Sequence, residues 1–122
     1  MTAKQWKAKI KRNCKAVGTY KKEFEPVIDT LANILEKRDE AEEQFTASGR
    51  RAIVKHKNKA GAENLEQNPV LRIINDLNRD ALTYWRELGL TAASLKKINE
   101  AAIKNGSELS ALDKALLELD RG

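Results

Sequence analysis

The feature that most constrains the fold is a pair of apolar seams whose residues are spaced alternately four and three apart. The first seam runs through Tyr20, Phe24, Val27, Leu31, Ile34, Arg38, Ala41 and Phe45. The second runs through Val70, Ile74, Leu77, Ala81, Tyr84 and Leu88. This spacing keeps side chains on one face of an α-helix. The sequence therefore predicts a mainly α fold built on an antiparallel hairpin of two long helices.

Local signals place the ends of these two helices. Pro26 indicates either a helix start near Glu25 after an irregular lead-in, or a kink. Asn68-Pro69 is typical of a helix start, because Asn caps well and Pro fits the first helical position. Gly89 is expected to end this second helix. Between the two, residues 50–64 predict a basic loop or a short hairpin.

Shorter helices are expected on either side of the hairpin. Residues 2–17 combine an apolar stripe with a lysine-covered face, and Gly18 can end that helix. Thr91 can cap a further helix that ends at Asn105-Gly106, and a final short helix is expected after it. The predicted segments are a basic N-terminal helix (1–18), a helical core and oligomerisation domain (19–105) and a C-terminal tail helix (106–122).

Charge is segregated along the chain, whose net charge is +5. Residues 1–22 contain eight Lys or Arg and no acid, and residues 48–62 contain five more, again with no acid. Residues 23–47 contain eight acids against two bases. Segregated positive blocks are typical of proteins that bind a polyanion.

The two basic blocks are therefore the candidate DNA contacts. Lysines on consecutive helical turns can follow phosphates, and arginine can bind a phosphate with two parallel bonds. A solvated helix face and a flexible solubilising loop are the simpler interpretations of the same residues. The candidate DNA-binding residues are Lys4, Lys7, Lys9, Lys11, Arg12, Lys15, Arg50, Arg51, Lys55, Lys57 and Lys59.

Oligomerisation is expected from the composition. A chain of 122 residues with 34% charged residues can build only a thin core by itself. Arg38 interrupts the first seam and is expected to pair with Asp76 or Asp80 on the facing helix, where a polar group could set register or oligomeric state. The candidate core and oligomerisation residues are Phe24, Leu31, Ile34, Arg38, Leu71, Ile74, Tyr84 and Trp85.

Signatures of catalysis are missing from the sequence. No glycine begins the phosphate-binding pattern that ends in Gly-Lys-Ser/Thr. His56 is the only histidine and lies far along the chain from Cys14, the only cysteine, which disfavours a zinc site or a Cys–His nucleophile. The acids within residues 36–43 spread around a helix instead of converging. We expect no enzymatic activity, no metal and no cofactor.

Compartment signals point to the cytoplasm. No stretch of about 18 apolar residues is present, so no membrane span is expected. The N-terminal residues lack the apolar core of a signal peptide. The lone Cys14 cannot form an internal disulfide, which suits a reducing compartment.

Two functions other than that of an oligomeric protein on long DNA fit these observations. The step Gly89-Leu90-Thr91 between two helices allows a helix-turn-helix, with Lys96, Lys97 and Asn99 toward a DNA groove, as in a small transcriptional repressor. Alternatively, the chain is a helical interaction protein whose basic charge binds an acidic protein. Binding to long DNA separates an oligomeric DNA-binding protein from the second alternative. A closed ring, as opposed to a dimer on paired half-sites, separates it from the first.

The segment from Asn68-Pro69 through Tyr84-Trp85 to Leu88-Gly89-Leu90-Thr91 resembles the small subunit of tailed-phage terminases. Ala92 departs from the proline that many relatives have there, and this weakens one helix-start signal. The resemblance covers about residues 5–100. Further matching runs are Trp6 to Tyr20, Ile28 to Ala32, and Asn58 to Gly61 followed by Asn64.

The resemblance implies a division of labour. Terminase small subunits recognise viral DNA at the packaging initiation site, assemble into rings of many copies, and recruit and regulate the large subunit, which carries the ATPase and nuclease. For this chain it implies that the helical hairpin forms the ring wall and that the basic segments face double-stranded DNA in the cytoplasm of the bacterial host. Residues 107–122 are the predicted docking segment for the large subunit, because they carry apolar residues at helical spacing.

Overall fold

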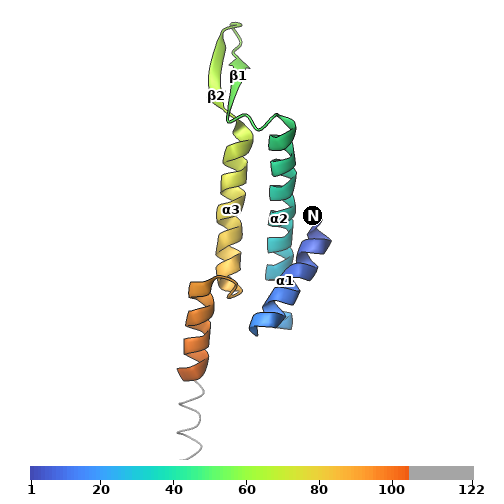
Figure 1. Cartoon of the computed structure of the whole chain (residues 1–122), viewed down its shortest axis with the longest axis vertical. Helices are drawn as coiled ribbons and strands as arrows, with labels where there is room; N and C mark the ends of the chain where they lie inside the picture. Colours follow the sequence, from blue (N-terminus) through green and yellow to red (C-terminus); the bar gives the residue numbers. More distant parts are fainter. Residues whose placement is uncertain (105–122) are drawn as a thin grey trace, which may run out of the picture.

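The computed structural model describes residues 1–104 and is mainly helical, with one small sheet. The elements are α1 (Ala3–Val17), the 3-10 turn η1 (Lys22–Phe24), α2 (Glu25–Ala47), β1 (Ile53–Lys57), β2 (Glu63–Gln67) and α3 (Pro69–Glu87). Residues 92–104 are also helical. In Figure 1, α2 and α3 lie side by side with opposite chain directions, and the strands extend beyond one end of this pair. The prediction of a mainly α fold is confirmed.

The observed helix ends follow the local sequence signals. Thr2 and Gln5 form a capping box at the start of α1, and Gly18 ends it with a left-handed φ of 80°. Pro26 lies in the first turn of α2, which follows the 3-10 lead-in, so it marks a helix start and not a kink. The expected helix end at Asn105-Gly106 and the tail 106–122 lie outside the described residues.

The segment between the long helices is a hairpin, which decides between the two predicted alternatives. β1 and β2 pair antiparallel, with Lys57 opposite Glu63 at the turn end. The Asn58 side chain organises the turn, because its Oδ1 accepts the backbone N–H groups of Ala60 and Ala62, each at 3.0 Å. This is the local bonding that makes asparagine a turn former.

Asn68 joins this hairpin to α3. Its side-chain Oδ1 accepts the backbone N–H of Val70 at 3.2 Å, which is the predicted helix cap. Its Nδ2 donates to the backbone carbonyl of Arg51, which lies just before β1, at 3.0 Å. Asn68 is buried, so both ends of its amide are used where water is excluded.

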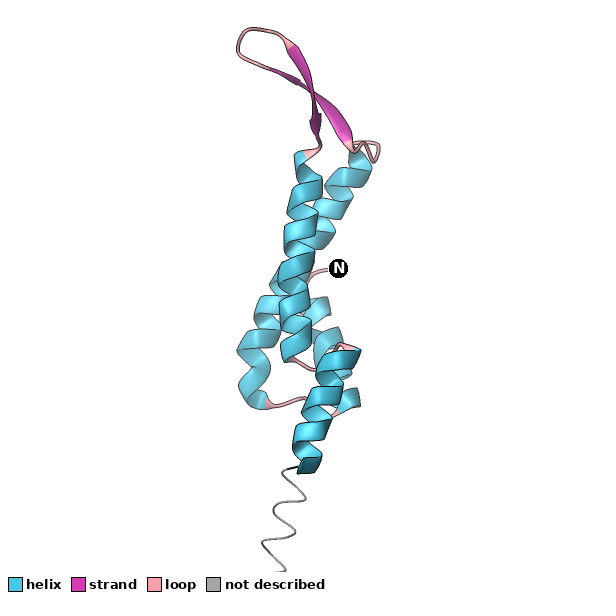
Figure 2. Ribbon diagram, turned by 90° about the vertical axis from the view of Figure 1, so that its left-hand side faces the viewer, coloured by secondary structure: helices cyan, strands magenta, loops and turns pink. Residues whose placement is uncertain are grey.

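The core consists of two clusters along the α2–α3 pair. α1 crosses α2 near the N-terminal half of α2 (Figures 1 and 2), and it contributes Trp6, Ile10 and Cys14 to the first cluster. α2 and α3 complete that cluster with Ile28, Leu31, Ala32, Leu35, Ala81 and Leu88. The second cluster, toward the hairpin, contains Ala41, Phe45, Val70 and Ile74. Burying each large aliphatic side chain contributes about 1.5–3 kcal/mol.

Most of the predicted core residues lie at these clusters. Leu31 and Ile74 are buried. The remaining apolar candidates are partly buried against one cluster or the other: Phe24, Ile34, Leu71, Tyr84 and Trp85. Their role between subunits stays a prediction.

The prediction that Arg38 pairs with α3 was wrong. Its guanidinium lies 3.3 Å from Asp39 Oδ1 and 5.4 Å from the centroid of the Trp6 ring. Asp76 instead pairs with Arg79, one turn along α3, with 3.9 Å between its Oδ1 and the Arg79 Nη2. The seam spacing predicted that Arg38 faces α3, whereas its guanidinium pairs with Asp39 on its own helix and lies over Trp6 of α1, which docks there.

No helix within residues 1–104 combines the length and the apolar character needed to cross a membrane.

Candidate nucleic-acid interface

One flank of α1 is paired with acids of α2. Lys7 Nζ lies 2.7 Å from Asp29 Oδ1 and 3.3 Å from Glu25 Oε2. Lys11 Nζ lies 2.9 Å from Glu25 Oε1. These two lysines hold α1 against α2, which leaves less of their charge for a phosphate. Their assignment as DNA contacts stays a prediction.

The Glu25 carboxylate is the centre of this network. Hydrogen bonds from the Tyr20 hydroxyl, at 2.6 Å, and from Lys11 lower the pKa of Glu25 from 4.5 to about 2. On the other side, the bond to Asp29, followed by the bond to Glu25, raises the pKa of Lys7 above 10.5. Each charged group thus favours the ionised form of its partner.

A sequence signal for this network exists and concerns spacing. Lys7 and Lys11 are four residues apart, and so are Glu25 and Asp29. Residues four apart share one face of a helix, so two such pairs of opposite charge match each other when their helices pack. Spacing alone does not say which helices pack, and for that reason charge counting missed these pairs.

The outer face of α1 carries four cations without an acidic partner among the described residues. Lys4, Lys9, Arg12 and Lys15 are exposed, and within residues 1–104 none of them forms an ion pair. Lys15 lies over the Tyr20 ring, 4.9 Å from its centroid, which limits its motion while leaving its charge at the surface. At 1.5 Å per residue, these four cations extend over roughly 17 Å of helix.

The second basic block, residues 48–62, lies beside acidic residues in the folded chain. The ladder places Glu63 opposite Lys57, and β2 also carries Glu66, which lies opposite Val54. Lys55 lies opposite Leu65 and has no acid across the ladder. An opposite charge across a strand pair partly neutralises a lysine. The hairpin is therefore basic along β1 and acidic along β2.

The base and the tip of the hairpin keep their positive charge. Arg50 and Arg51 precede β1, and Lys59 lies in the turn; all three are exposed. Arg50 adopts a left-handed φ of 55°, and its guanidinium lies over the Phe45 ring, 5.1 Å from the centroid. That contact holds an exposed cation near the end of α2.

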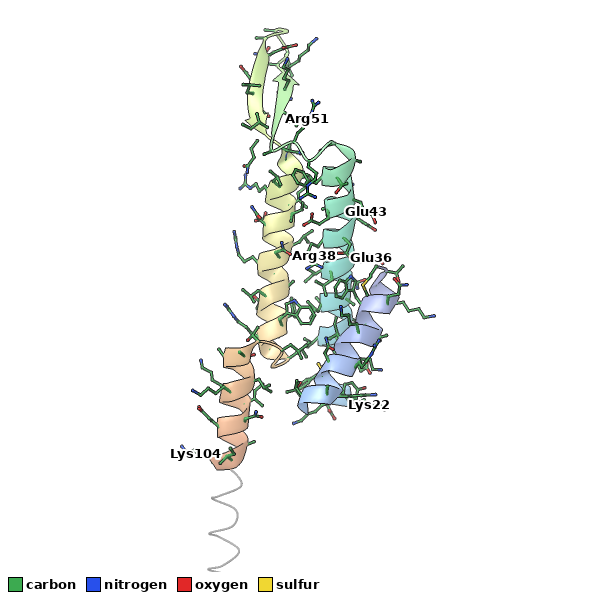
Figure 3. The ribbon with its side chains drawn as sticks, viewed as in Figure 1. Lys22, Glu36, Arg38, Glu43, Arg51 and Lys104 are labelled. Carbon is green, nitrogen blue, oxygen red and sulfur yellow. The ribbon has the colours of Figure 1, made fainter. Side chains whose placement is uncertain are left out.

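The two predicted basic blocks are not brought together within one chain. Figure 3 shows Lys22, at the end of the first block, and Arg51, at the start of the second, near opposite ends of α2. A single DNA segment that contacts both blocks must therefore run along the length of the molecule, or else contact different blocks on different copies.

The acids of α2 that face α1 have a structural role that the sequence did not reveal. The Ala3 N–H donates to Glu36, and the Trp6 indole N–H donates to Asp39. A carboxylate near a helix N-terminus is favourable because it meets the positive end of the helix dipole. Although burial opposes ionisation of Asp39, hydrogen bonds from Trp6 and from the chain's amino terminus lower its pKa. In the described part of the chain, no group of three or more His, Cys, Asp or Glu side chains could hold a metal ion.

The turn after α3 forms a groove with α1. Thr91 and Ser94 cap the helix at residues 92–104 reciprocally, as predicted for Thr91. Val17, Trp85 and Leu95 help to line a groove of about 530 Å³ beside this turn. The helix runs onward along the long axis of the molecule (Figures 1 and 2), whereas a helix-turn-helix crosses its partner steeply. Lys96, Lys97 and Asn99 are exposed on it.

Comparison with known proteins gives a match to a family model. A family model described as phage terminase, small subunit, matches residues 2–105 of the 122-residue chain. No curated protein and no solved structure is significantly similar to it. The match covers α1, the α2–α3 pair, the hairpin and the described helix that follows, which is the same region that carried the sequence resemblance. The chain belongs to the family of phage terminase small subunits.

Proposed function

We propose that this chain binds double-stranded viral DNA at the packaging initiation site as a ring of many copies. In this proposal it recruits and regulates the terminase large subunit in the host cytoplasm and has no catalysis of its own. Family membership supports a role in DNA packaging, while the DNA contacts and the ring are inferred from the surface chemistry.

The observation that carries the proposal is the cationic outer face of α1. Lys4, Lys9, Arg12 and Lys15 stand exposed on one helix, whereas Lys7 and Lys11 are paired with α2 acids. A rigid row of cations is suited to phosphates because binding releases counterions from the DNA. Arg50, Arg51 and Lys59 provide a second set of contacts at the hairpin.

The ring is supported by apolar residues on two flanks of α3. Ile73 and Leu82 keep 50% and 40% of their surface exposed. They are nine residues apart, so at about 100° per residue they point to opposite sides of the helix. A subunit in a ring has one neighbour on each side and therefore needs two different contact surfaces. The exposed apolar residues on opposite sides of α3 provide one for each neighbour.

The experiment that tests this proposal is native mass measurement of the purified protein, alone and with DNA, at low and moderate salt. We expect a single high-order oligomer. If each copy that contacts DNA uses the four outer cations of α1, a plot of the logarithm of the binding constant against the logarithm of the salt concentration should have a slope of about −4 per copy. The contribution of α1 is tested with a variant in which Lys4, Lys9, Arg12 and Lys15 are all changed to Gln, which should lose this salt dependence.

Each outcome separates the proposed functions. An oligomer that binds DNA in a salt-dependent way supports the packaging subunit. A dimer bound to one short DNA site would favour the repressor. A monomer that is indifferent to DNA but binds an acidic protein would favour the interaction protein. If the quadruple variant binds DNA as the parent does, α1 does not contact DNA.

A further inference from the structure

The groove beside the turn after α3 is open and mostly apolar. It has a volume of about 530 Å³ and lies where the end of α1, the end of α3 and the start of the helix at residues 92–104 meet. Its larger apolar side chains are those of Val17, Trp85, Leu90 and Leu95. Val17 keeps 37% of its surface exposed. A concave apolar surface of this kind is typical of a docking site for an amphipathic helix.

The apolar surface continues from the groove along the helix at residues 92–104. Leu95, Ile98 and Ala102 are spaced three and four apart, which places them on one face of that helix. Ile98 keeps 39% of its surface exposed. The helix extends about 18 Å at 1.5 Å per residue. Its apolar face therefore leads from the groove to the point where residues 105–122 begin.

Residues 105–122 lie outside the described part of the chain, but their sequence has the matching pattern. Asn105-Gly106 is typical of a helix end. Four leucines follow at intervals of three, four and three, which is the spacing of one apolar helical face. They are Leu109, Leu112, Leu116 and Leu119.

The length of this segment allows it to return to the groove. As a helix, residues 107–119 would extend about 18 Å, the same length as the helix that precedes them. A short turn at residues 105–106 would let the two helices pack antiparallel, as in other helical hairpins. That return brings Leu116 beside Leu95 and carries Leu119 to the groove.

Charge and tethering favour the same occupant. Residues 107–122 contain four acids against two bases, whereas residues 92–104 contain three lysines against one acid. Lys96 lies 4.0 Å from Glu100, and within residues 1–104 Lys97 forms no ion pair. Because the segment is attached to one wall of the groove, its effective concentration there is high, which is an advantage that a separate partner lacks.

We propose that residues 107–119 fold back along residues 92–104 of the same chain and seat Leu116 and Leu119 in the groove. Residues 107–122 are also the predicted docking segment for the large subunit. The seating therefore covers their apolar face until the large subunit displaces them. This covering role rests on the proposed function, whereas the seating itself does not.

Cross-linking within the full chain tests the seating. Asp120→Cys marks the segment, and Ala92→Cys lies on the exposed lining of the groove, while the native Cys14 is buried. A short bis-maleimide should join the two new thiols within one chain, as measured by mass spectrometry. The matched control pairs Asp120→Cys with Thr83→Cys, which is exposed but points about 200° away from Trp85 around α3. We expect roughly tenfold more linking to Ala92→Cys than to Thr83→Cys.

Removal of the apolar contacts provides the second measurement. Leu116→Glu with Leu119→Glu, added to the chain with Ala92→Cys and Asp120→Cys, should reduce linking to the level of the control, because a carboxylate does not enter an apolar groove. The backbone amides of residues 89–95 should then exchange faster with solvent deuterium. Leu117→Glu is the matched control, because Leu117 lies outside the four-leucine spacing, and it should change neither result.

The large subunit tests the covering role. Purified large subunit, added to the chain with Ala92→Cys and Asp120→Cys before the cross-linker, should lower the yield of the link in proportion to the complex formed. A yield that the large subunit leaves unchanged would overturn the covering role and not the seating.

The remaining outcomes distinguish the seating from the proposed function. Equal linking to the groove and to the control position, or linking that survives the two glutamates, would overturn the seating and leave the packaging function standing. Covalent dimers in place of links within one chain would put a neighbour's segment in the groove and overturn the same-chain arrangement. A chain that neither assembles nor binds DNA would overturn the proposed function without changing the yield of the link.

Discussion

The indole N–H of Trp6 donates a hydrogen bond to Asp39 Oδ2 at 2.7 Å, and this bond joins α1 to the middle of α2. Arg38 completes the contact, because it pairs with Asp39 and lies over the Trp6 ring. The charged residue that interrupts the apolar seam of α2 therefore serves the docking of α1. It stabilises the helix that carries the candidate DNA-binding face.

Trp6→Phe tests the energy of this contact. The substitution keeps an aromatic ring but removes the N–H donor, so the partly buried Asp39 carboxylate loses a partner. We expect a loss of about 1–3 kcal/mol in the free energy of unfolding, measured by urea denaturation. Trp6→Ala should cost more, about 3–5 kcal/mol, because it also leaves a cavity. Equal stability of Trp6→Phe and the parent would contradict a structural role for the hydrogen bond.

The sequence was sufficient where a local signal decides the structure. Gly18 and Asn68 each mark a helix boundary through their own backbone or side-chain chemistry, and the structure places boundaries at both. At Pro26 the sequence left a helix start and a kink open, and the structure shows a start. The period of the seams identified the residues that α3 buries and three of those that α2 buries, Leu31, Ala41 and Phe45. It missed Ile28, Ala32 and Leu35, which α2 also buries. These features depend on residues that are near each other along the chain, so they can be predicted from a single sequence.

The sequence was insufficient where the partner lies on another element. The seam located Arg38 on its helix, but not the neighbour it would contact, and the arrival of α1 decided that. β2 has the sequence Glu-Asn-Leu-Glu-Gln, with little strand signal of its own, and it pairs because β1 and the Asn58 turn precede it. The charge blocks identified α1 as a candidate site, yet only packing showed that Lys7 and Lys11 are paired and Arg12 is not.

The pH dependence of stability tests the Glu25 network. Glu25 has a folded pKa of about 2, below its ordinary value of 4.5. A depressed carboxyl pKa contributes stability that is present above the unfolded value and is lost as the pH falls through the folded one. Glu25→Gln should therefore lower the melting temperature at pH 7 but have progressively less effect between about pH 4.5 and 2.

The control for this prediction is Glu43→Gln, which removes an exposed acid from the same helix. It should leave both the melting temperature and its pH profile nearly unchanged. A Glu25→Gln deficit that is the same at pH 7 and at the acid end would show that the substitution acts through packing and not through the carboxylate charge.

Two kinds of cation on α1 should behave differently in DNA binding. Arg12→Gln removes an exposed charge, so the log–log salt slope of binding should fall by about 1 per engaged copy, with little change in melting temperature. Lys7→Gln breaks two ion pairs with α2, so it should lower the melting temperature and change the salt slope less. Filter binding or fluorescence anisotropy over a salt series measures the slope. Identical slopes for the two variants would mean that pairing with α2 does not withdraw Lys7 from DNA.

The turn that joins α3 to the helix at residues 92–104 is crowded by neighbouring side chains at Gly89. Gly89 has a φ of 69°, and a Cβ there would lie 2.8 Å from Ile98 Cδ1 and 3.0 Å from Thr19 Cγ2. Gly89→Ala therefore adds a clash to the backbone cost of a left-handed residue. Gly18→Ala is the matched control, because Gly18 has a φ of 80° and open space around its Cβ position.

We expect Gly18→Ala to cost about 1–2 kcal/mol, which is the conformational cost alone. Gly89→Ala should cost roughly 0.5–1.5 kcal/mol more, because the end of the partly exposed Ile98 side chain must leave its rotamer and the Thr19 methyl group must give way slightly. The clash lies between the new methyl group and the following helix, so hydrogen exchange should also show faster amide exchange at residues 92–98 in Gly89→Ala and not in Gly18→Ala. Equal losses of stability with unchanged exchange would mean that this helix is not held against the turn, and that the groove beside Trp85 does not persist in solution.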